Sequence, residues 1–185
     1  METRLMNDDL AALARTRDQT LPYFGADPAM QARRYAPGKW TLRQFLLHTV
    51  DCEGVLLDRL RRVLAEEQPL LLAFDENRWN DRLFSDQRDL RAAEALFVAT
   101  RAAVIELATL CPPELHGRTG THSVKGTRTF AGLVRFIHQH NAHHVEQIAA
   151  IAAGRPWTPR ADDPLNAAYA VAPPTPTPQP PPPVP

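Results

Sequence analysis

The segment Phe130–Gly154 constrains the fold more than any other part of the chain. At 3.6 residues per turn, one face of this segment is apolar except for two histidines in its middle. That face consists of Leu133, Phe136, Ile137, His140, His144, Ile148 and Ile151. Such a face has to be buried against other elements, so the segment predicts a long helix in a packed core.

His140 and His144 are four residues apart, so their side chains lie one above the other on one helix face. A rise of about 1.5 Å per residue separates them by about 6 Å along the axis. Two imidazoles placed in this way can bind one divalent metal ion. The spacing alone leaves open a second interpretation, a pair of core histidines with hydrogen-bond partners.

Three further helices are predicted, at Met6–Leu21, Thr41–Glu67 and Ser85–Leu110. Thr41 and Gln44 fit a capping box at the start of the second. The third should turn five side chains inward, namely Leu90, Leu96, Phe97, Val104 and Leu107. Four helices with polar outer faces predict an all-α four-helix bundle over residues 1–157.

The connections differ in character. Phe24–Gly38 reads as a connection with a turn of helix from Asp27, and Pro69–Arg82 as an ordered loop. Glu114–Thr129 holds three glycines and is predicted to be a long loop or a short hairpin. Loops of that length in a compact domain are often functional.

From residue 158 onward the composition changes. Nine of the eighteen prolines fall in Pro173–Pro185, which predicts a flexible polyproline-II tail over residues 158–185.

Charge and composition exclude several classes of protein. Lys plus Arg and Asp plus Glu both number 21, so no basic surface for nucleic acid or membrane is indicated. Cys52 and Cys111 suggest no disulfide framework. No secretion signal or membrane span is recognised, and a cytoplasmic location is expected.

A third histidine, His48, lies inside the second predicted helix. In a bundle, metal sites are built from inward residues on facing helices. One ligand from this helix and two from the last would make a three-histidine site with positions left open. That arrangement is typical of catalytic zinc, whereas structural zinc sites are closed by four protein ligands.

Three segments together resemble the DinB/YfiT-like metal-dependent enzymes. They are PGKWTLRQFLLHTVDCE (Pro37–Glu53), AFDENRWND (Ala73–Asp81) and HQHNAHHVEQI (His138–Ile148). Within that family, the sequence resembles the YfiT type most, and this type includes bacillithiol S-transferases. The resemblance implies an up-down four-helix bundle, a homodimer, and a divalent metal held by His48, His140 and His144.

Several neighbours are candidates for supporting roles. Asp51 could accept the second N–H of His48, although a salt bridge on the helix surface is an open alternative. His143 is interpreted as a residue beside the site or on the surface, and Gln147 as a partner for substrate or water. Cys52 is expected to be a buried apolar residue rather than a fourth ligand.

The remaining histidines and two tryptophans are not predicted to bind the metal directly, with two possible exceptions in the glycine-rich loop. His138 should face away from His140, while His116 and His122 lie in the glycine-rich loop and could reach the metal. Trp40 and Trp79 are expected to close the pocket at the end of the bundle. Asp75, Glu76 and Arg78 are expected to hold their loop by ion pairs.

The chemistry follows from the ligand set. Three neutral imidazoles leave the full charge on the ion, which can activate a thiol or water. Zinc or nickel is favoured, and manganese or iron is admissible. Asn141 stands where a HExxH peptidase has Glu, which argues against a peptidase.

The leading prediction is a thiol S-transferase that uses a low-molecular-weight thiol, of the bacillithiol type, and a small electrophile. A metal-dependent hydrolase is the first alternative. The second is a non-catalytic bundle that binds metal or a small ligand.

Overall fold

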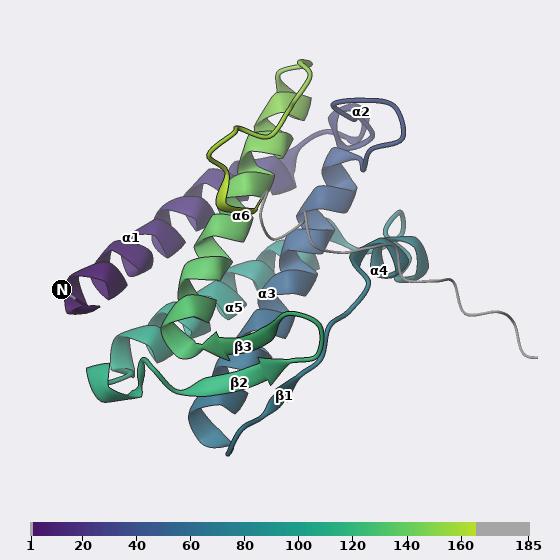
Figure 1. The fold of residues 1–185 in the computed structure, drawn as a ribbon. Coiled ribbons are helices and arrows are strands. Elements are labelled where there is room, and N and C mark those ends of the chain that lie inside the picture. Colours follow the sequence, from purple (N-terminus) through teal and green to yellow (C-terminus); the bar gives the residue numbers. More distant parts are fainter. Residues whose placement is uncertain (1, 166–185) are drawn as a thin grey trace, which may run out of the picture.

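A computed structural model describes residues 2–165, with side chains from Met6 onward (Figure 1). The predicted polyproline segment Pro173–Pro185 lies outside the described residues. Six α-helices and two 3-10 turns are present: α1 (Glu2–Thr20), η1 (Leu21–Gly25), α2 (Pro28–Gln31), α3 (Leu42–Ala65), α4 (Glu76–Arg82), α5 (Leu90–Leu110), η2 (Pro113–Leu115) and α6 (Phe130–Ala152). Three short strands complete the described part: β1 (Leu70–Leu71), β2 (Thr119–His122) and β3 (Gly126–Thr129).

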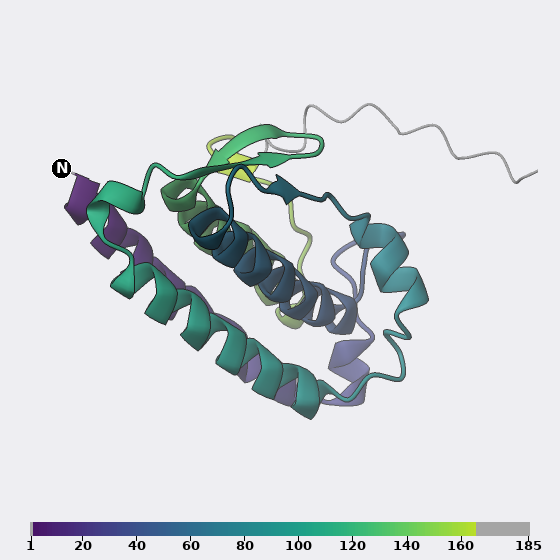
Figure 2. The ribbon, with the colours of Figure 1, turned by 90° about the horizontal axis from the view of Figure 1, so that it is seen from below.

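The four long helices α1, α3, α5 and α6 form the predicted bundle, which is therefore confirmed. Helix α3 packs against α5 and α6, and α1 packs against the same two helices. Figure 2 shows α3 and α6 as one layer and α1 and α5 as the other. A small sheet covers the layer of α3 and α6 on its outer side.

The directions of the helices follow from two apolar clusters, one at each end of the bundle. One cluster joins the beginnings of α1 and α6 to the ends of α3 and α5, through Met6, Phe130, Val63 and Cys111. The other joins the segment after α1 and the end of α6 to the beginnings of α3 and α5, through Phe24, Ile151, Leu42 and Leu90. The chain therefore runs up, down, down and up. This order departs from simple alternation at one connection, because residues 66–89 lead the chain back along the bundle.

Part of that connection, Pro69–Arg82, was predicted to be an ordered loop. It contains regular structure instead. It forms strand β1 and helix α4, and the side chain of Asp75 caps α4 by accepting a hydrogen bond from the Arg78 N–H at 2.9 Å. Helix α5 begins at Leu90 and not at Ser85, because Asp89 caps it there. The Ser85 hydroxyl instead donates to the carbonyl of Asn80 at 2.6 Å.

The prediction that Leu96 of α5 belongs to the core is wrong. Leu96 is 54% exposed, whereas Phe97 and Val104 are fully buried. The buried stripe of α5 passes through Phe97, and Leu96 faces a groove beside β1 and α4.

Side-chain caps are present at the start of both helices that carry the clustered histidines, and the one on α3 was predicted. The Gln44 N–H donates to Thr41 Oγ1 at 3.1 Å and Gln44 Oε1 accepts from the Thr41 N–H at 2.9 Å, so the capping box is confirmed. Thr129 caps α6 by accepting from the Gly132 N–H at 3.0 Å. These caps fix where α3 and α6 begin, and so which faces they turn inward.

The segment Glu114–Thr129 contains the short hairpin that was one of its two predicted forms. Strands β2 and β3 pair antiparallel, and β1 adds to β2 in parallel. Gly120 allows this sheet to lie close to α3, because an added Cβ would come within 3.1 Å of both Pro69 and Val63.

After α6 the chain turns back along the bundle. Gly154 has a φ of +64°, a conformation that favours glycine after a helix. Asp163 and Leu165 are buried, and Asp163 contacts His143 of α6, so this end of the described chain packs against the bundle. Within residues 2–165, no helix is long and apolar enough to cross a membrane.

Candidate metal centre

The three histidines predicted as ligands meet between α3 and α6. His48 Nε2 lies 3.4 Å from His140 Nε2, and His144 Nε2 lies 3.1 Å from the same atom. All three side chains are buried. Helices α3 and α6 run antiparallel, so the first third of α3 faces the middle of α6, and this places the rings together.

These separations fit ligands of one metal ion. Zinc binds imidazole nitrogen at about 2.0–2.1 Å, and tetrahedral angles then place two such nitrogens about 3.3 Å apart. The observed 3.1 and 3.4 Å bracket that distance. The donor atoms that all lie within 4.8 Å of one another are those of His48, Cys52 and His140, so these three residues could hold a metal ion. His144 joins the cluster through His140.

Burial keeps the three imidazoles neutral. It lowers the pKa of His48 to about 4. It also lowers the pKa values of His140 and His144 well below the ordinary value, and the neighbouring histidines add to this by repulsion. Neutral imidazole is the form that binds a metal, since its lone pair is free.

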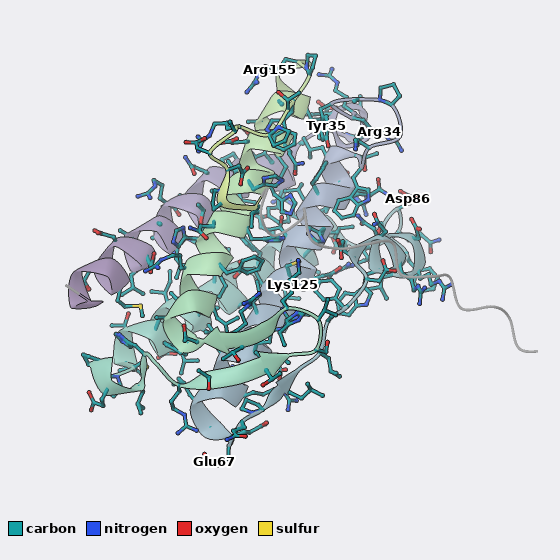
Figure 3. The ribbon with its side chains drawn as sticks, viewed as in Figure 1. Arg34, Tyr35, Glu67, Asp86, Lys125 and Arg155 are labelled. Carbon is teal, nitrogen blue, oxygen red and sulfur yellow. The ribbon has the colours of Figure 1, made fainter. Side chains whose placement is uncertain are left out.

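Gln147 holds His144 in one orientation. Its Oε1 lies 2.6 Å from His144 Nδ1, so Nδ1 carries the proton and Nε2 presents its lone pair toward His140. Gln147 also shares a hydrogen bond with the hydroxyl of Tyr35. Tyr35 lies at the end of the bundle where α6 ends and α3 begins (Figure 3).

Cys52 adds a sulfur atom to the cluster. Its Sγ lies 3.4 Å from His48 Nε2 and 4.0 Å from His140 Nε2. It also lies 3.7 Å from His48 Nδ1, which places the sulfur beside the imidazole rather than beyond Nε2. Burial, followed by the charge of Glu53, raises the pKa of the thiol well above its usual value, so the sulfur stays protonated.

Aromatic side chains surround the imidazoles. The ring of Trp40 lies 4.8 Å from that of His48, Phe45 lies 5.6 Å from His144, and Phe136 lies 5.6 Å from His140, measured between centroids. Trp40 thus stands against the site as predicted. Trp79 does not: it packs on Phe74 at 4.5 Å and lines a separate groove.

The predicted contact from Asp51 to His48 is not formed. Asp51 binds the guanidinium of Arg88 through both of its oxygens, each at 2.8 Å. The open alternative, a salt bridge, is therefore the observed one. Asp51 projects toward the segment that leads into α5, away from the cluster.

His143 lies beside the cluster, buried against the segment that follows α6. Its Nδ1 is 2.6 Å from Asp163 Oδ2, and its ring meets that of Trp157 edge-on at 5.0 Å. The centroid of His143 is 5.3 Å from that of His144. Asp163 and Trp157 were not predicted, because their sequence context gives no sign that the chain folds back.

The remaining histidines lie elsewhere. His116 Nε2 is 3.2 Å from the carbonyl of Cys111, near the opposite end of α5. His122 Nδ1 accepts from the N–H groups of Val124 and Lys125 in the hairpin turn. His138 faces away from the cluster, as predicted, and its Nε2 lies 2.8 Å from Asp9 of α1.

A buried ion pair that the sequence did not reveal crosses the bundle beneath the site. Arg101 of α5 binds both oxygens of Glu53, which follows Cys52 on α3. Arg101 also donates to the carbonyl of Leu13 at 2.6 Å and to Asn141 Oδ1 at 3.3 Å. The guanidinium therefore connects all four long helices.

Comparison with known proteins agrees with this architecture. A sequence profile of the DinB superfamily matches residues 12–148. Two proteins of Oceanobacillus iheyensis, each named as a predicted metal-dependent hydrolase, are 24% and 23% identical to the chain. The alignments cover 66% and 63% of this chain and 71% and 67% of those proteins.

A solved structure shares the fold. YfiT from Bacillus subtilis, described as a probable metal-dependent hydrolase with an unusual four-helix bundle topology, superposes with a TM-score of 0.75. The match covers 80% of this chain and 86% of that one, at 20% sequence identity.

Proposed function

The chain belongs to the DinB superfamily, and from that membership we propose that it is a metal-dependent enzyme with a small thiol as substrate. The observation that carries this proposal is the convergence of three neutral imidazole nitrogens, from His48, His140 and His144, in one buried place. The names of the Oceanobacillus relatives support metal dependence.

His48, His140 and His144 would hold the metal through Nε2. Gln147 would keep His144 in the required tautomer, since its Oε1 accepts the Nδ1 proton. Trp40, Phe45 and Phe136 would keep water from the outer sides of the rings. Zinc or nickel suits an all-nitrogen ligand set, and manganese or iron is compatible with it.

When bound, a divalent ion supplies positive charge that lowers the pKa of a coordinated thiol or water and stabilises negative charge. In the proposed reaction a thiol R–SH meets an electrophile R′–X. A bond forms between sulfur and carbon, the bond between carbon and X breaks, and the thiol proton leaves with X.

Resemblance to the YfiT type favours bacillithiol or a similar thiol as the substrate. Hydrolysis is the alternative within the same site, and it is favoured by the names of the relatives. Water would then take the place of the thiol, and the histidines would keep their roles.

A second candidate function is a non-catalytic metal-binding bundle, and the position of Cys52 favours it, because its Sγ lies 3.4 Å from His48 Nε2 and 4.0 Å from His140 Nε2. If the Cys52 side chain rotated so that Sγ came beyond His48 Nε2, four protein ligands would close the site. Closed sites of this kind are structural. Substitution of Cys52 distinguishes the two, as described in the Discussion.

The test combines metal content with turnover. Protein purified without a histidine tag is analysed by plasma mass spectrometry, beside His48→Ala, His140→Ala and His144→Ala. One metal per chain in the wild type, lost in each folded variant, is expected. Conjugation of a thiol to monochlorobimane should then require the metal. If the purified protein binds neither zinc, nickel nor manganese, the proposed metal site is refuted. If the protein binds metal but turns over no thiol or ester, the non-catalytic function is supported instead.

A further inference from the structure

A large cavity in the described part of the chain lies away from the histidines. It has a volume of about 870 Å³ and runs between the outer side of α3 and the segment formed by β1 and α4. None of the three clustered histidines lines it. Its volume is in the range of pockets that hold small molecules. The proposed metal chemistry gives it no role.

The cavity wall is mostly apolar, and part of it is unusually exposed. Leu70, Leu72 and Leu96 line it and are 57%, 67% and 54% exposed. Phe74 and Trp79, whose ring centroids are 4.5 Å apart, form another part of the wall. Contiguous exposed apolar surface of this kind marks binding sites on soluble domains more often than it occurs by chance.

Among the charged residues of the wall, each carboxylate already has a partner. Asp51 binds Arg88 at 2.8 Å, and Asp58 accepts from Arg62 Nε at 2.7 Å. Asp75 lies 3.7 Å from Arg78 Nε. The acidic groups of the cavity are therefore neutralised by other residues.

Arg59 is the exception, because it forms no ion pair with any residue that the structure describes. Its side chain lines the cavity and the residue is only 8% exposed. Nη2 donates to the Leu72 carbonyl at 2.6 Å, whereas Nε is buried and has no hydrogen-bond partner. Among the described residues, no carboxylate oxygen lies within the 4.0 Å of an ion pair with Arg59. A buried cation without a counter-ion is costly, and a bound anion would offset that cost.

We propose that this cavity binds a small molecule with an apolar body and one carboxylate, and that Arg59 binds the carboxylate. The leucines and the Phe74–Trp79 pair would contact the apolar body. A guanidinium suits this role because it can donate two parallel hydrogen bonds to a carboxylate. The site does not depend on the proposed metal centre, so it can be tested on metal-free protein.

Octanoate is a suitable probe, and octanol is its uncharged control. Binding to the full chain is measured by isothermal titration calorimetry. Arg59→Gln should weaken octanoate binding about tenfold or more, because it removes the positive charge and the paired donors that bind the carboxylate. Arg61→Gln is the matched control: Arg61 is an exposed arginine on the same helix that does not line the cavity, so binding should change less than about twofold.

Gly54 offers a second variant that leaves Arg59 intact. An added Cβ there would meet no atom within 4 Å, and the residue lines the cavity in the middle of α3. Gly54→Leu should narrow the cavity and weaken octanoate binding, while a leucine in place of a glycine favours the helix. This variant decides the matter if Arg59→Gln does not fold.

The proposal is overturned if the wild type does not bind octanoate, or if octanoate and octanol bind equally well. It is also overturned if Arg59→Gln folds and binds octanoate as the wild type does. The groove could instead be covered by a second copy of the chain, and light scattering tests this by measuring the oligomeric state. If the protein is a dimer that Gly54→Leu dissociates, and octanoate does not bind, then a second copy covers the groove and the proposal fails.

Discussion

His144 and Gln147 are one turn apart on α6, and His144 Nδ1 lies 2.6 Å from Gln147 Oε1. The contact determines which nitrogen of His144 carries the proton, and it turns the lone pair of Nε2 toward His140. Residues that orient metal ligands in this way contribute to metal affinity although they do not touch the ion.

Gln147→Ala should therefore weaken metal binding by about 10–100-fold without abolishing it. Without the amide oxygen, His144 can adopt the other tautomer or turn away. Affinity is measured by competition with a chromogenic chelator. Glu146→Gln is the control, because Glu146 is the preceding residue on α6 and contacts Arg160 rather than a histidine. Equal affinities for Gln147→Ala and the wild type would show that Gln147 does not orient the ligand.

Cys52→Ala should keep one metal per chain. The thiol is buried and its pKa is raised, and the sulfur stands beside the His48 ring rather than beyond its nitrogen. With cobalt(II) in place of the native metal, wild type and variant should give the same spectrum, without a thiolate charge-transfer band. A band in the wild type that Cys52→Ala removes, together with weaker binding, would support the closed site and a non-catalytic function.

The periodicity of α6 accounts for much of what the sequence predicted correctly. A strong apolar stripe, interrupted by His140 and His144, requires a partner helix, and His48 lies in the best candidate. Local signals such as the Thr41–Gln44 box predicted where α3 begins. These features depend on residues close in sequence, so periodicity and capping rules apply to them.

Long-range pairing accounts for what was missed. Asp51 pairs with Arg88 and Glu53 with Arg101 because α3 and α5 run parallel, and no short pattern encodes that direction. Asp163 reaches His143 only because the chain turns at Gly154 and packs back on α6. The sequence of residues 155–165 contains no periodic stripe that would have predicted this.

The metal-free protein should lose stability as the pH falls below about 6.5. Burial lowers the pKa of His48 to about 4 in the folded state, while the unfolded chain has an ordinary histidine. Between these values the unfolded state binds more protons, so the free energy of unfolding rises with pH. The contribution is fully present above pH 6.5 and is lost progressively toward pH 4.

The titration of His48 alone should lower the free energy of unfolding at pH 5.5 by about 1 kcal/mol relative to pH 7.5. His140 and His144 act in the same direction. Urea unfolding in the presence of a chelator, at both pH values, measures the difference. His48→Gln should show a smaller dependence on pH than the wild type. If the two proteins depend on pH equally, His48 is not the group that titrates.

The buried pair of Arg101 and Glu53 should be one of the most sensitive places in the fold. Arg101 is fully buried and Glu53 is 2% exposed. Glu53→Gln removes the negative charge but keeps the shape, and it leaves a guanidinium uncompensated in the core. Breaking a buried pair in this way costs about 3–5 kcal/mol. Arg62→Gln, which breaks an exposed pair with Asp58, should cost less than about 1 kcal/mol.

Removing both charges separates the cost of an unpaired charge from the value of the pair itself. Arg101→Met combined with Glu53→Met should be more stable than Arg101→Met alone, because no buried charge then lacks a partner. Some loss relative to the wild type should remain, since Leu13 and Thr16 lose their hydrogen bonds from Arg101. Chemical denaturation of the four proteins forms a double-mutant cycle. Additive losses would mean that the two residues act independently, and that the guanidinium stabilises the bundle through its contacts with α1 instead.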